Sequence, residues 1–247
     1  MARLIDIDAV LRDWPYEPGV VSARLVVTDT GREVLQMRIE MGLLQMEVNG
    51  RPDGTMPGGA ETYLDYLISE TFQEGEAFQL TEEHCAEVDR EFLQFYHRRI
   101  CWLALREFNL AIWDADHTLA LIHFIEKHSP DAEWVESHTR QRPFVLFHRT
   151  QAATLAALEE AGFEEAIEEL NRGIAKLKRV LPKHEEEEAA EANQMILQLG
   201  DLKNWIREHF GVDRTLSERL SDAVANEQYE LAAKLRDEIA RRRAFKE

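Results

Sequence analysis

The residues best suited to chemistry in this 247-residue chain are histidines and cysteines placed about one helical turn apart. His97 and Cys101 are four positions apart, so on a helix they share one face, and that spacing can chelate a metal ion. Other ligand types lie nearby in the sequence: His84, Cys85, Asp114, Asp116 and His117. However, the sequence has no Cys-x-x-Cys pair and no His-Glu-x-x-His run, and Cys101 lies in the apolar stretch 100–103. We interpret Cys101 as a buried structural cysteine and predict no metal site and no cofactor.

Signatures of other catalytic machinery are missing from the sequence. It has no glycine-rich phosphate loop and no Gly-x-Ser-x-Gly nucleophile elbow. The 47 carboxylates are too numerous for one acid–base pair to be singled out, and the acidic run 185–188 is typical of a solvated helix start. We therefore predict no catalytic residue and a protein that is not an enzyme. One alternative stays open, an enzyme with an unrecognised site near the turn-rich loop Asn49–Gly59.

Two basic spots occur in an otherwise acidic chain. They consist of His97, Arg98, Arg99, His148 and Arg149. If the helices that carry them stack as repeats, these side chains can line a groove for acidic peptides. The alternative is that they pair with nearby acids inside the molecule.

The C-terminal segment has the most informative pattern. It predicts a helix, a polar break at Asn226-Glu227, and a second helix. Each helix has about three turns, which is too short for stability alone in water, so the two are expected to pair through Ala232 and Ala233. Two thin helices cannot cover both apolar stripes, which leaves apolar surface for a partner.

This segment, residues 214–247, resembles the UVR motif, a helical hairpin shared by the bacterial excision-nuclease subunits UvrB and UvrC. The motif also occurs in a Clp-family ATPase and in an activator of a protein arginine kinase. The resemblance rests on the series aromatic-Glu-x-Ala-Ala-x-Leu-Arg-Asp-x-Ile, which spans residues 229–239 here. It implies a docking element that binds a partner protein, another hairpin of this type or a second copy of itself. The alternative is a helix pair that only caps the helical domain. The residues predicted to contact the partner are Leu216, Leu220, Val224, Tyr229, Ala232, Leu235, Arg236 and Ile239.

Composition limits the class of partner and the compartment. The formal net charge is −18, which argues against a general nucleic-acid binder and against an anionic membrane surface. No apolar run approaches the ~20 residues of a membrane-spanning helix, and the first residues lack the apolar stretch of a signal peptide. The two cysteines form no disulfide framework. We expect a reduced, cytoplasmic protein.

Glycine and proline divide the chain. Eight of the twelve glycines precede residue 76 and none lies between 76 and 161, so a strand-rich start should precede a helical remainder. Alternation of apolar and polar residues predicts strands at 20–28, 34–39 and 44–48, followed by a helix at about 61–71. Thr81 is expected to cap the next helix.

The predicted fold is mainly α, with four parts. They are a small N-terminal αβ element (1–80), a helical body (81–182), a long acidic helix and loop (183–213), and the antiparallel helical hairpin (214–247). Within the body, Phe108, Ala111 and Ile112 match Phe163, Ala166 and Ile167 at an offset of 55. With Pro182 closing the second copy, the two helix pairs resemble tetratricopeptide repeats. An ordinary helical bundle is the alternative.

The functional prediction follows from the hairpin. We expect a non-enzymatic cytoplasmic adaptor that docks a partner protein through residues 214–247. The second interpretation is a regulatory subunit of a nuclease, a Clp-type ATPase or a kinase complex, with the hairpin as tether.

Overall fold

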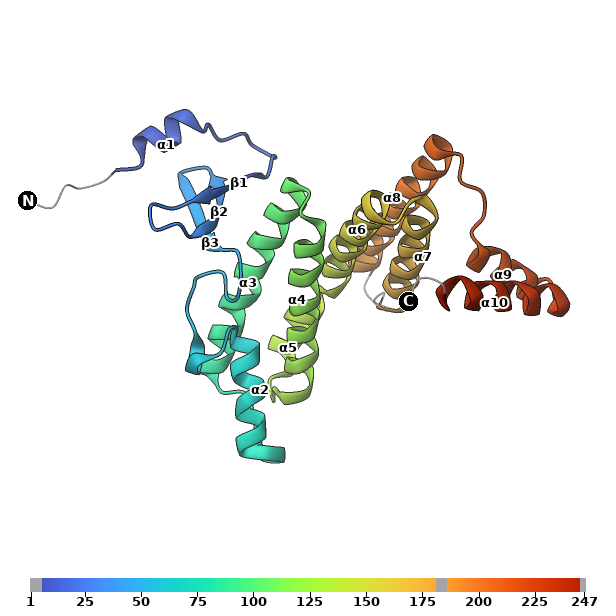
Figure 1. Cartoon of the computed structure of the whole chain (residues 1–247). Coiled ribbons are helices and arrows are strands. Elements are labelled where there is room, and N and C mark those ends of the chain that lie inside the picture. Colours follow the sequence, from blue (N-terminus) through green and yellow to red (C-terminus); the bar gives the residue numbers. More distant parts are fainter. Residues whose placement is uncertain (1–5, 181–185, 245–247) are drawn as a thin grey trace, which may run out of the picture. The chain divides into compact units, whose positions relative to one another are not determined.

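The structure, a computed structural model, describes residues 6–180 and 186–244, and most of these are helical (Figure 1). The chain forms two compact units, one ending at Ala152 and one beginning at Ala153. The division falls within helix α6 (Arg142–Glu160), inside the segment 81–182 that the sequence analysis treats as one body. The predicted fold class is confirmed: the chain is mainly α, with a small N-terminal sheet and a C-terminal helical hairpin.

The predicted strands are present within two residues of their expected ends. They are β1 (Ser22–Val27), β2 (Glu33–Ile39) and β3 (Gly42–Glu47), which form an antiparallel sheet in the order β1-β2-β3. Gly31, with φ of 79°, turns the chain between β1 and β2. Gly42 pairs with Ile39, so β2 and β3 are joined by a two-residue turn.

A short helix that the sequence pattern did not predict, α1 (Asp8–Asp13), precedes the sheet. The residue that follows it, Trp14, is fastened to the sheet by polar contacts. Arg38 Nε donates to the Trp14 carbonyl (2.7 Å), and Trp14 Nε1 donates to Ser22 Oγ (2.7 Å). The Arg24 guanidinium lies 4.3 Å from the Trp14 ring centre. These contacts give the short helix a fixed attachment that its own length cannot provide.

Four helices complete the first unit before α6. They are α2 (Tyr63–Glu74), α3 (Glu82–Leu105), α4 (Phe108–His128) and α5 (Ala132–Thr139), with the 3-10 turns η1 (Pro57–Gly59) and η2 (Gly75–Ala77) on either side of α2. Thr81 caps α3 as predicted, since its hydroxyl accepts the His84 N–H (3.3 Å). The longest of these four helices, α3 and α4, form a hairpin whose turn places Arg106 in the left-handed region (φ of 63°).

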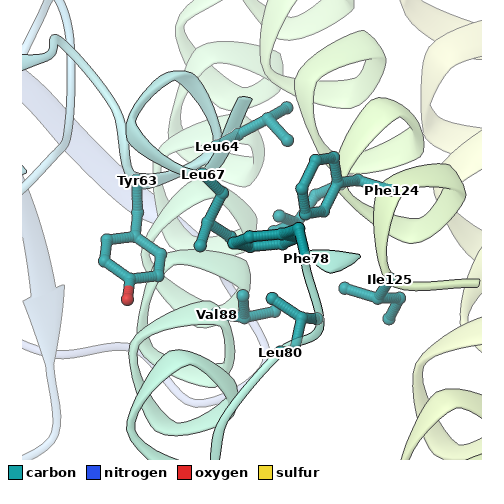
Figure 2. Packing of buried hydrophobic residues seen from close by; sticks show 9 residues of the cluster. Tyr63, Leu64, Leu67, Phe78, Leu80, Val88, Phe124 and Ile125 are labelled. Atoms are coloured by element: carbon teal, nitrogen blue, oxygen red, sulfur yellow. The ribbon is translucent and has the colours of Figure 1, made fainter. Parts of the chain in front are cut away.

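One hydrophobic cluster of the first unit forms where α2, α3 and α4 meet. Figure 2 shows the Phe78 ring among aliphatic side chains from these helices, near Phe124. The buried members of the cluster are Tyr63, Leu64, Leu67, Phe78, Leu80, Val88, Leu121, Phe124 and Ile125. The Leu80 N–H donates to the His128 carbonyl (3.0 Å), which ties the start of α3 to the end of α4. This core therefore holds one face of α2 and leaves its other face outside.

The second unit continues from the end of α6 with α7 (Phe163–Val180), α8 (Glu186–Phe210), α9 (Leu216–Ala225) and α10 (Tyr229–Ala244). Helices α7 and α8 pack together, with Phe163 stacked on Phe210 at 4.0 Å between ring centres. Pro182 and Glu185, the expected end of one helix and start of the next, lie outside the described residues.

The two similar helix pairs share some of their packing. Ala111 and Ala166 are both buried, as close helix approach requires, but Phe108 is buried whereas Phe163 is 40% exposed. The turns also differ, because Arg106 carries the positive φ in the first pair and Gly162 carries it in the second. The tetratricopeptide-like resemblance stays a prediction.

Candidate functional site

The C-terminal hairpin has a small apolar core of its own. Leu216 and Ala223 of α9 pack against Ala232 and Leu235 of α10, and all four side chains are less than a tenth exposed. Leu220 and Ile239 are partly buried against this cluster, and Figure 1 shows the two helices side by side. Of the two alanines expected to pair the helices, Ala232 is buried but Ala233 is exposed. The hairpin is therefore stabilised from inside, mainly by one residue per turn from each helix.

The polar break between the helices is a tight C-cap. The Gln228 N–H donates to the Ala223 carbonyl (2.8 Å) and the Glu227 N–H donates to the Val224 carbonyl (3.1 Å), which is the Schellman pattern. Glu227 occupies the left-handed position, with φ of 57°, where glycine is the usual residue. This turn returns the chain directly into α10.

One carboxylate, Glu218, joins the hairpin to the helices before it. It accepts the Thr215 N–H (3.0 Å) while Thr215 Oγ1 accepts the Glu218 N–H, so the two residues form a capping box at the start of α9. The same carboxylate receives Lys203 Nζ (2.5 Å) and Arg207 from α8 and Asn171 Nδ2 (3.1 Å) from α7. Burial alone would raise the pKa of Glu218, but hydrogen bonds from Lys203, the Thr215 N–H and Asn171 outweigh it and lower that pKa.

These contacts lie in a polar hollow of about 400 Å³ in the second unit. Its lining consists of Glu168, Asn171, Lys203, Arg207, Arg214, Ser217, Glu218, Ser221 and Asp222. Its acids and bases are largely paired with one another, as in the contact of Arg214 with Asp222. The hollow is thus the place where α9 contacts α7 and α8. Glu218 was not among the predicted site residues, although the spacing Thr-x-x-Glu at 215–218 is the signature of a capping box.

The predicted partner-contact residues fall into two groups. Leu216, Ala232 and Leu235 are buried inside the hairpin, and Leu220 and Ile239 are partly buried there. Val224 (53% exposed) and Tyr229 (68%) lie at the surface, together with Leu231 (42%), which the sequence analysis did not include. Arg236 is also exposed and pairs with its neighbour Asp237 (3.0 Å). The apolar surface that remains therefore lies within eight residues around the hairpin turn.

The predicted peptide groove is corrected by the burial of its arginines. Arg98 is completely buried, and its guanidinium makes three hydrogen bonds to Asp114 (2.7, 3.0 and 3.2 Å). The same guanidinium donates to the carbonyls of Glu47 (3.1 Å) and Gly50 (2.8 Å). Burial raises the pKa of Asp114, and the hydrogen bonds from Arg98 oppose that rise. Arg98 fastens the loop after β3 to helix α3 and is not available to a peptide.

The other basic residues are also committed to internal contacts. Arg99, 1% exposed, donates to Thr118 Oγ1 (3.0 Å) and approaches His148 Nδ1 (3.4 Å). Burial and the Arg99 charge lower the pKa of His148 to about 4, so this imidazole is neutral near pH 7. Burial lowers the pKa of His97 as well, and Arg149 pairs with Asp116 (2.5 Å). The intramolecular pairing weighed for these residues is what the structure shows.

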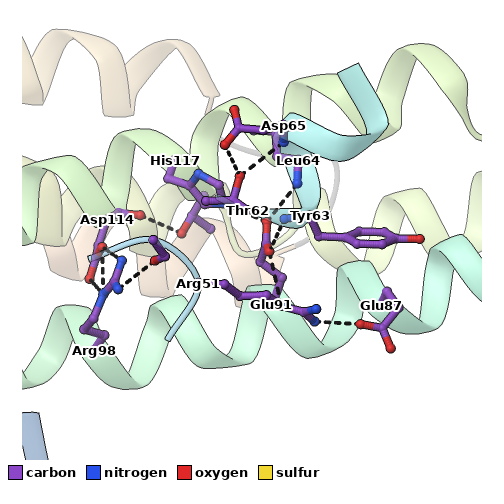
Figure 3. Close-up of polar contacts among 12 residues, drawn as sticks. Arg51, Thr62, Tyr63, Leu64, Asp65, Glu87, Glu91, Arg98, Asp114 and His117 are labelled. Atoms are coloured by element: carbon purple, nitrogen blue, oxygen red, sulfur yellow. Dashed lines mark hydrogen bonds and ion pairs between the residues drawn. The ribbon is translucent and has the colours of Figure 1, made fainter. Parts of the chain in front are cut away.

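The turn-rich loop Asn49–Gly59 inserts an arginine into the first unit. Arg51, 4% exposed, bonds Glu87 (2.7 Å) and lies 3.4 Å from the fully buried carboxylate of Glu91. Glu91 accepts the backbone N–H groups of Tyr63 (2.6 Å) and Leu64 (3.0 Å), at the start of α2, and contacts His117 (2.9 Å). Figure 3 shows this network beside the Arg98–Asp114 pair. A carboxylate at a helix N-terminus is favourable, so the loop, α2 and α3 are held together by charge.

The candidate metal ligands do not gather into a site. No group of three or more histidine, cysteine or acidic side chains able to hold a metal ion occurs among the residues that the structure describes. Cys101 is buried, and burial raises the pKa of its thiol to about 12. His117 stacks on Phe95 (3.8 Å between ring centres) and contacts Glu91. Within the described part of the chain, no helix is long and apolar enough to cross a membrane.

Comparison with known proteins identifies the hairpin. Residues 214–244 match the family model of the UvrB/uvrC motif, as the sequence resemblance predicted. The match covers the two hairpin helices and the two residues that precede α9. Curated proteins gave no match to the chain, and solved structures gave none either.

Proposed function

We propose that the chain is a non-enzymatic adaptor whose UVR-type hairpin binds a helical hairpin of a partner protein. The observation that carries the proposal is a hairpin with its own closed core that still exposes Val224 and Tyr229 at its turn. Tyrosine is among the residues that most often dominate protein interfaces, because it buries a large apolar ring and retains a polar end.

A protein partner suits the hairpin better than a nucleic acid. Residues 214–247 have a net charge of 8 − 7 = +1 within a chain of net charge −18. Several of the hairpin's cations are already paired with acids: Arg214 with Asp222, Arg236 with Asp237, and Arg242 with Glu238. A backbone-binding surface needs cations that face phosphates instead.

The arginines of the other candidate regions make internal contacts, which also supports a function at the hairpin. Arg51, in the loop Asn49–Gly59, forms ion pairs with Glu87 and Glu91 inside the first unit. Arg98 and Arg99, which were predicted to line a peptide groove, bind Asp114 and Thr118 respectively. A regulatory subunit of a nuclease, Clp-type ATPase or kinase complex is a special case of the same proposal, in which the hairpin tethers the chain to the enzyme.

The test is affinity capture from cells with surface and core variants of the hairpin. Val224→Ser with Tyr229→Ser should reduce capture of the partner by about thirtyfold or more, because a buried interface tyrosine contributes about 2 kcal/mol. Leu197→Ser, at a 62% exposed position of α8, is the matched control and should capture normally. Leu235→Asp should also lose capture, since it places a charge in the hairpin core.

Unchanged capture by the Val224/Tyr229 variant would refute the proposed contact. A second measurement, anisotropy with duplex DNA at physiological salt, is expected to show no binding. Salt-sensitive binding of DNA in the sub-micromolar range would contradict the proposed protein partner and indicate that the partner is DNA.

A further inference from the structure

Helix α2 presents an apolar strip on the face that the core does not cover. Tyr63, Leu64 and Leu67 are buried against α3 and α4, whereas Ile68 is 38% exposed and Phe72 is 84% exposed. Ile68 and Phe72 are four positions apart and therefore lie one above the other on the helix surface. Asp65 and Ser69, both exposed, share this face. In Figure 1 the C-terminal end of α2 projects beyond the neighbouring helices of its unit.

The sequence around this strip contains acidic residues but no lysine or arginine. Residues 52–89 contain ten aspartates and glutamates and no lysine or arginine. Several of these acids are already paired inside the unit, for example Glu87 with Arg51. Others have no lysine, arginine or histidine within ion-pair distance among the described side chains: Glu61, Asp65, Glu70, Glu74, Glu82 and Glu83. The strip is thus an exposed apolar pair in a strongly negative field.

A local effect of that field is seen at Tyr66, one turn before Glu70. Burial and the neighbouring carboxylates of Glu70 and Glu74 raise the pKa of the Tyr66 phenol. No lysine or arginine among the described side chains forms an ion pair with Glu70 or Glu74, so their charges act on the surface of this helix.

We propose that the outward face of α2 binds a basic, amphipathic segment of a partner protein. Ile68 and Phe72 would be buried in the contact, and the surrounding carboxylates would pair with its lysines or arginines. Charge excludes the other occupants. A second copy would bring two acidic surfaces together, and DNA, RNA or an anionic membrane would be repelled for the same reason. This contact is separate from the hairpin, so the two proposals stand or fall independently.

The first experiment is selection of a random displayed peptide library on the purified full chain. We expect the enriched peptides to carry an excess of lysine and arginine interleaved with large apolar residues. A synthetic peptide from this set should bind Phe72→Ser at least about tenfold more weakly than the unmodified chain, because a phenylalanine side chain is no longer buried. Phe72 makes little contact with the core, so the variant should keep its fold. Leu197→Ser and Tyr229→Ser are the controls and should bind this peptide normally.

A charge variant tests the electrostatic part. Glu74→Lys, at the exposed last residue of α2, favours the helix through its dipole and should weaken binding and its salt dependence. Glu191→Lys on α8 is the matched control and should change neither. The proposal is overturned if the library yields no enrichment or yields neutral or acidic peptides. It is equally overturned if Phe72→Ser binds the peptide normally, or if sedimentation shows a dimer that Phe72→Ser abolishes.

Discussion

Replacing Glu218 should loosen the hairpin without unfolding the rest of the second unit. The carboxylate is 16% exposed and receives two cations from α8, an amide from α7 and the N–H of its own helix cap. An exposed ion pair contributes about 0–1 kcal/mol and the loss of one partner of a buried pair costs about 3–5 kcal/mol. The intermediate burial here therefore gives about 2–3 kcal/mol for Glu218→Ala.

A second substitution separates charge from capping. Glutamine can replace glutamate in a capping box, so Glu218→Gln keeps the cap at Thr215. It removes the charge that attracts Lys203 and Arg207, and its NH2 group replaces the oxygen that accepts from Lys203 and Asn171. We expect it to cost about 1–2 kcal/mol, less than alanine, because the cap contributes about 1 kcal/mol. Hydrogen exchange measures this directly: a loss of about 2 kcal/mol opens the α9 amides about thirtyfold more often.

The matched control is Glu230→Ala, an exposed acid in the first turn of α10. It should leave exchange in α9 within a few-fold of the unmodified chain, because a dipole contact contributes at most about 1 kcal/mol.

The pH dependence of hairpin stability gives an independent check. Since the folded pKa of Glu218 lies below its ordinary 4.5, the unfolded hairpin binds more protons in acid. The advantage over Glu218→Gln should be complete above about pH 4.5 and vanish as the pH falls through the folded pKa. Equal exchange rates in α9 for Glu218→Ala and the unmodified chain would refute the assignment of Glu218 as the anchor.

Two further predictions concern the first unit. Arg98→Met should destabilise it by about 3–5 kcal/mol, because Asp114 stays buried without its partner, and thermal unfolding followed by circular dichroism checks this. A shift in Tm no larger than that of an exposed arginine variant such as Arg90→Met would contradict it. The folded pKa of His148, about 4, lies below the ordinary 6.5, so stability present above pH 6.5 should be lost as the pH falls toward 4, by on the order of 3 kcal/mol. His148→Gln cannot gain that proton, and denaturant titrations across this range should show a flatter pH profile for it. Parallel profiles would argue against a buried neutral histidine.

Local patterns predicted the elements well because they depend on neighbours in sequence. Alternation located the three strands, and the side-chain chemistry of Thr81 located the start of α3. The hairpin was predictable for the same reason, since its two helices, its break and its motif are all contained in residues 214–244. Helix α1 was not, because its attachment to the sheet depends on Arg38, a residue more than twenty positions later.

The peptide groove was wrong because the burial of an arginine is decided by a distant partner. Arginine alone favours the surface, and nothing adjacent to Arg98 in the sequence offsets its charge. Its partner is Asp114, on the next helix. The sequence did contain a signal: Arg98 and Asp114 lie equally far from the turn at Arg106, so an antiparallel helix pair brings them to the same level.

In the hairpin, the apolar face of α9 was predicted correctly, but the prediction did not say which residues of that face are buried in the hairpin core and which remain exposed. Leu216, Leu220 and Val224 follow the i, i+4, i+8 series, and each step of four residues advances about 40° around an α-helix. Val224 is thus rotated about 80° from Leu216, whereas Ala223, seven residues on, is rotated by only about 20°. Accordingly Ala223 is 2% exposed and completes the core, and Val224 is 53% exposed. This rotation along the helix places the Val224 side chain outside the hairpin core, five positions before Tyr229 in the sequence. The exposed Val224 side chain is therefore part of the surface on which the proposed docking depends.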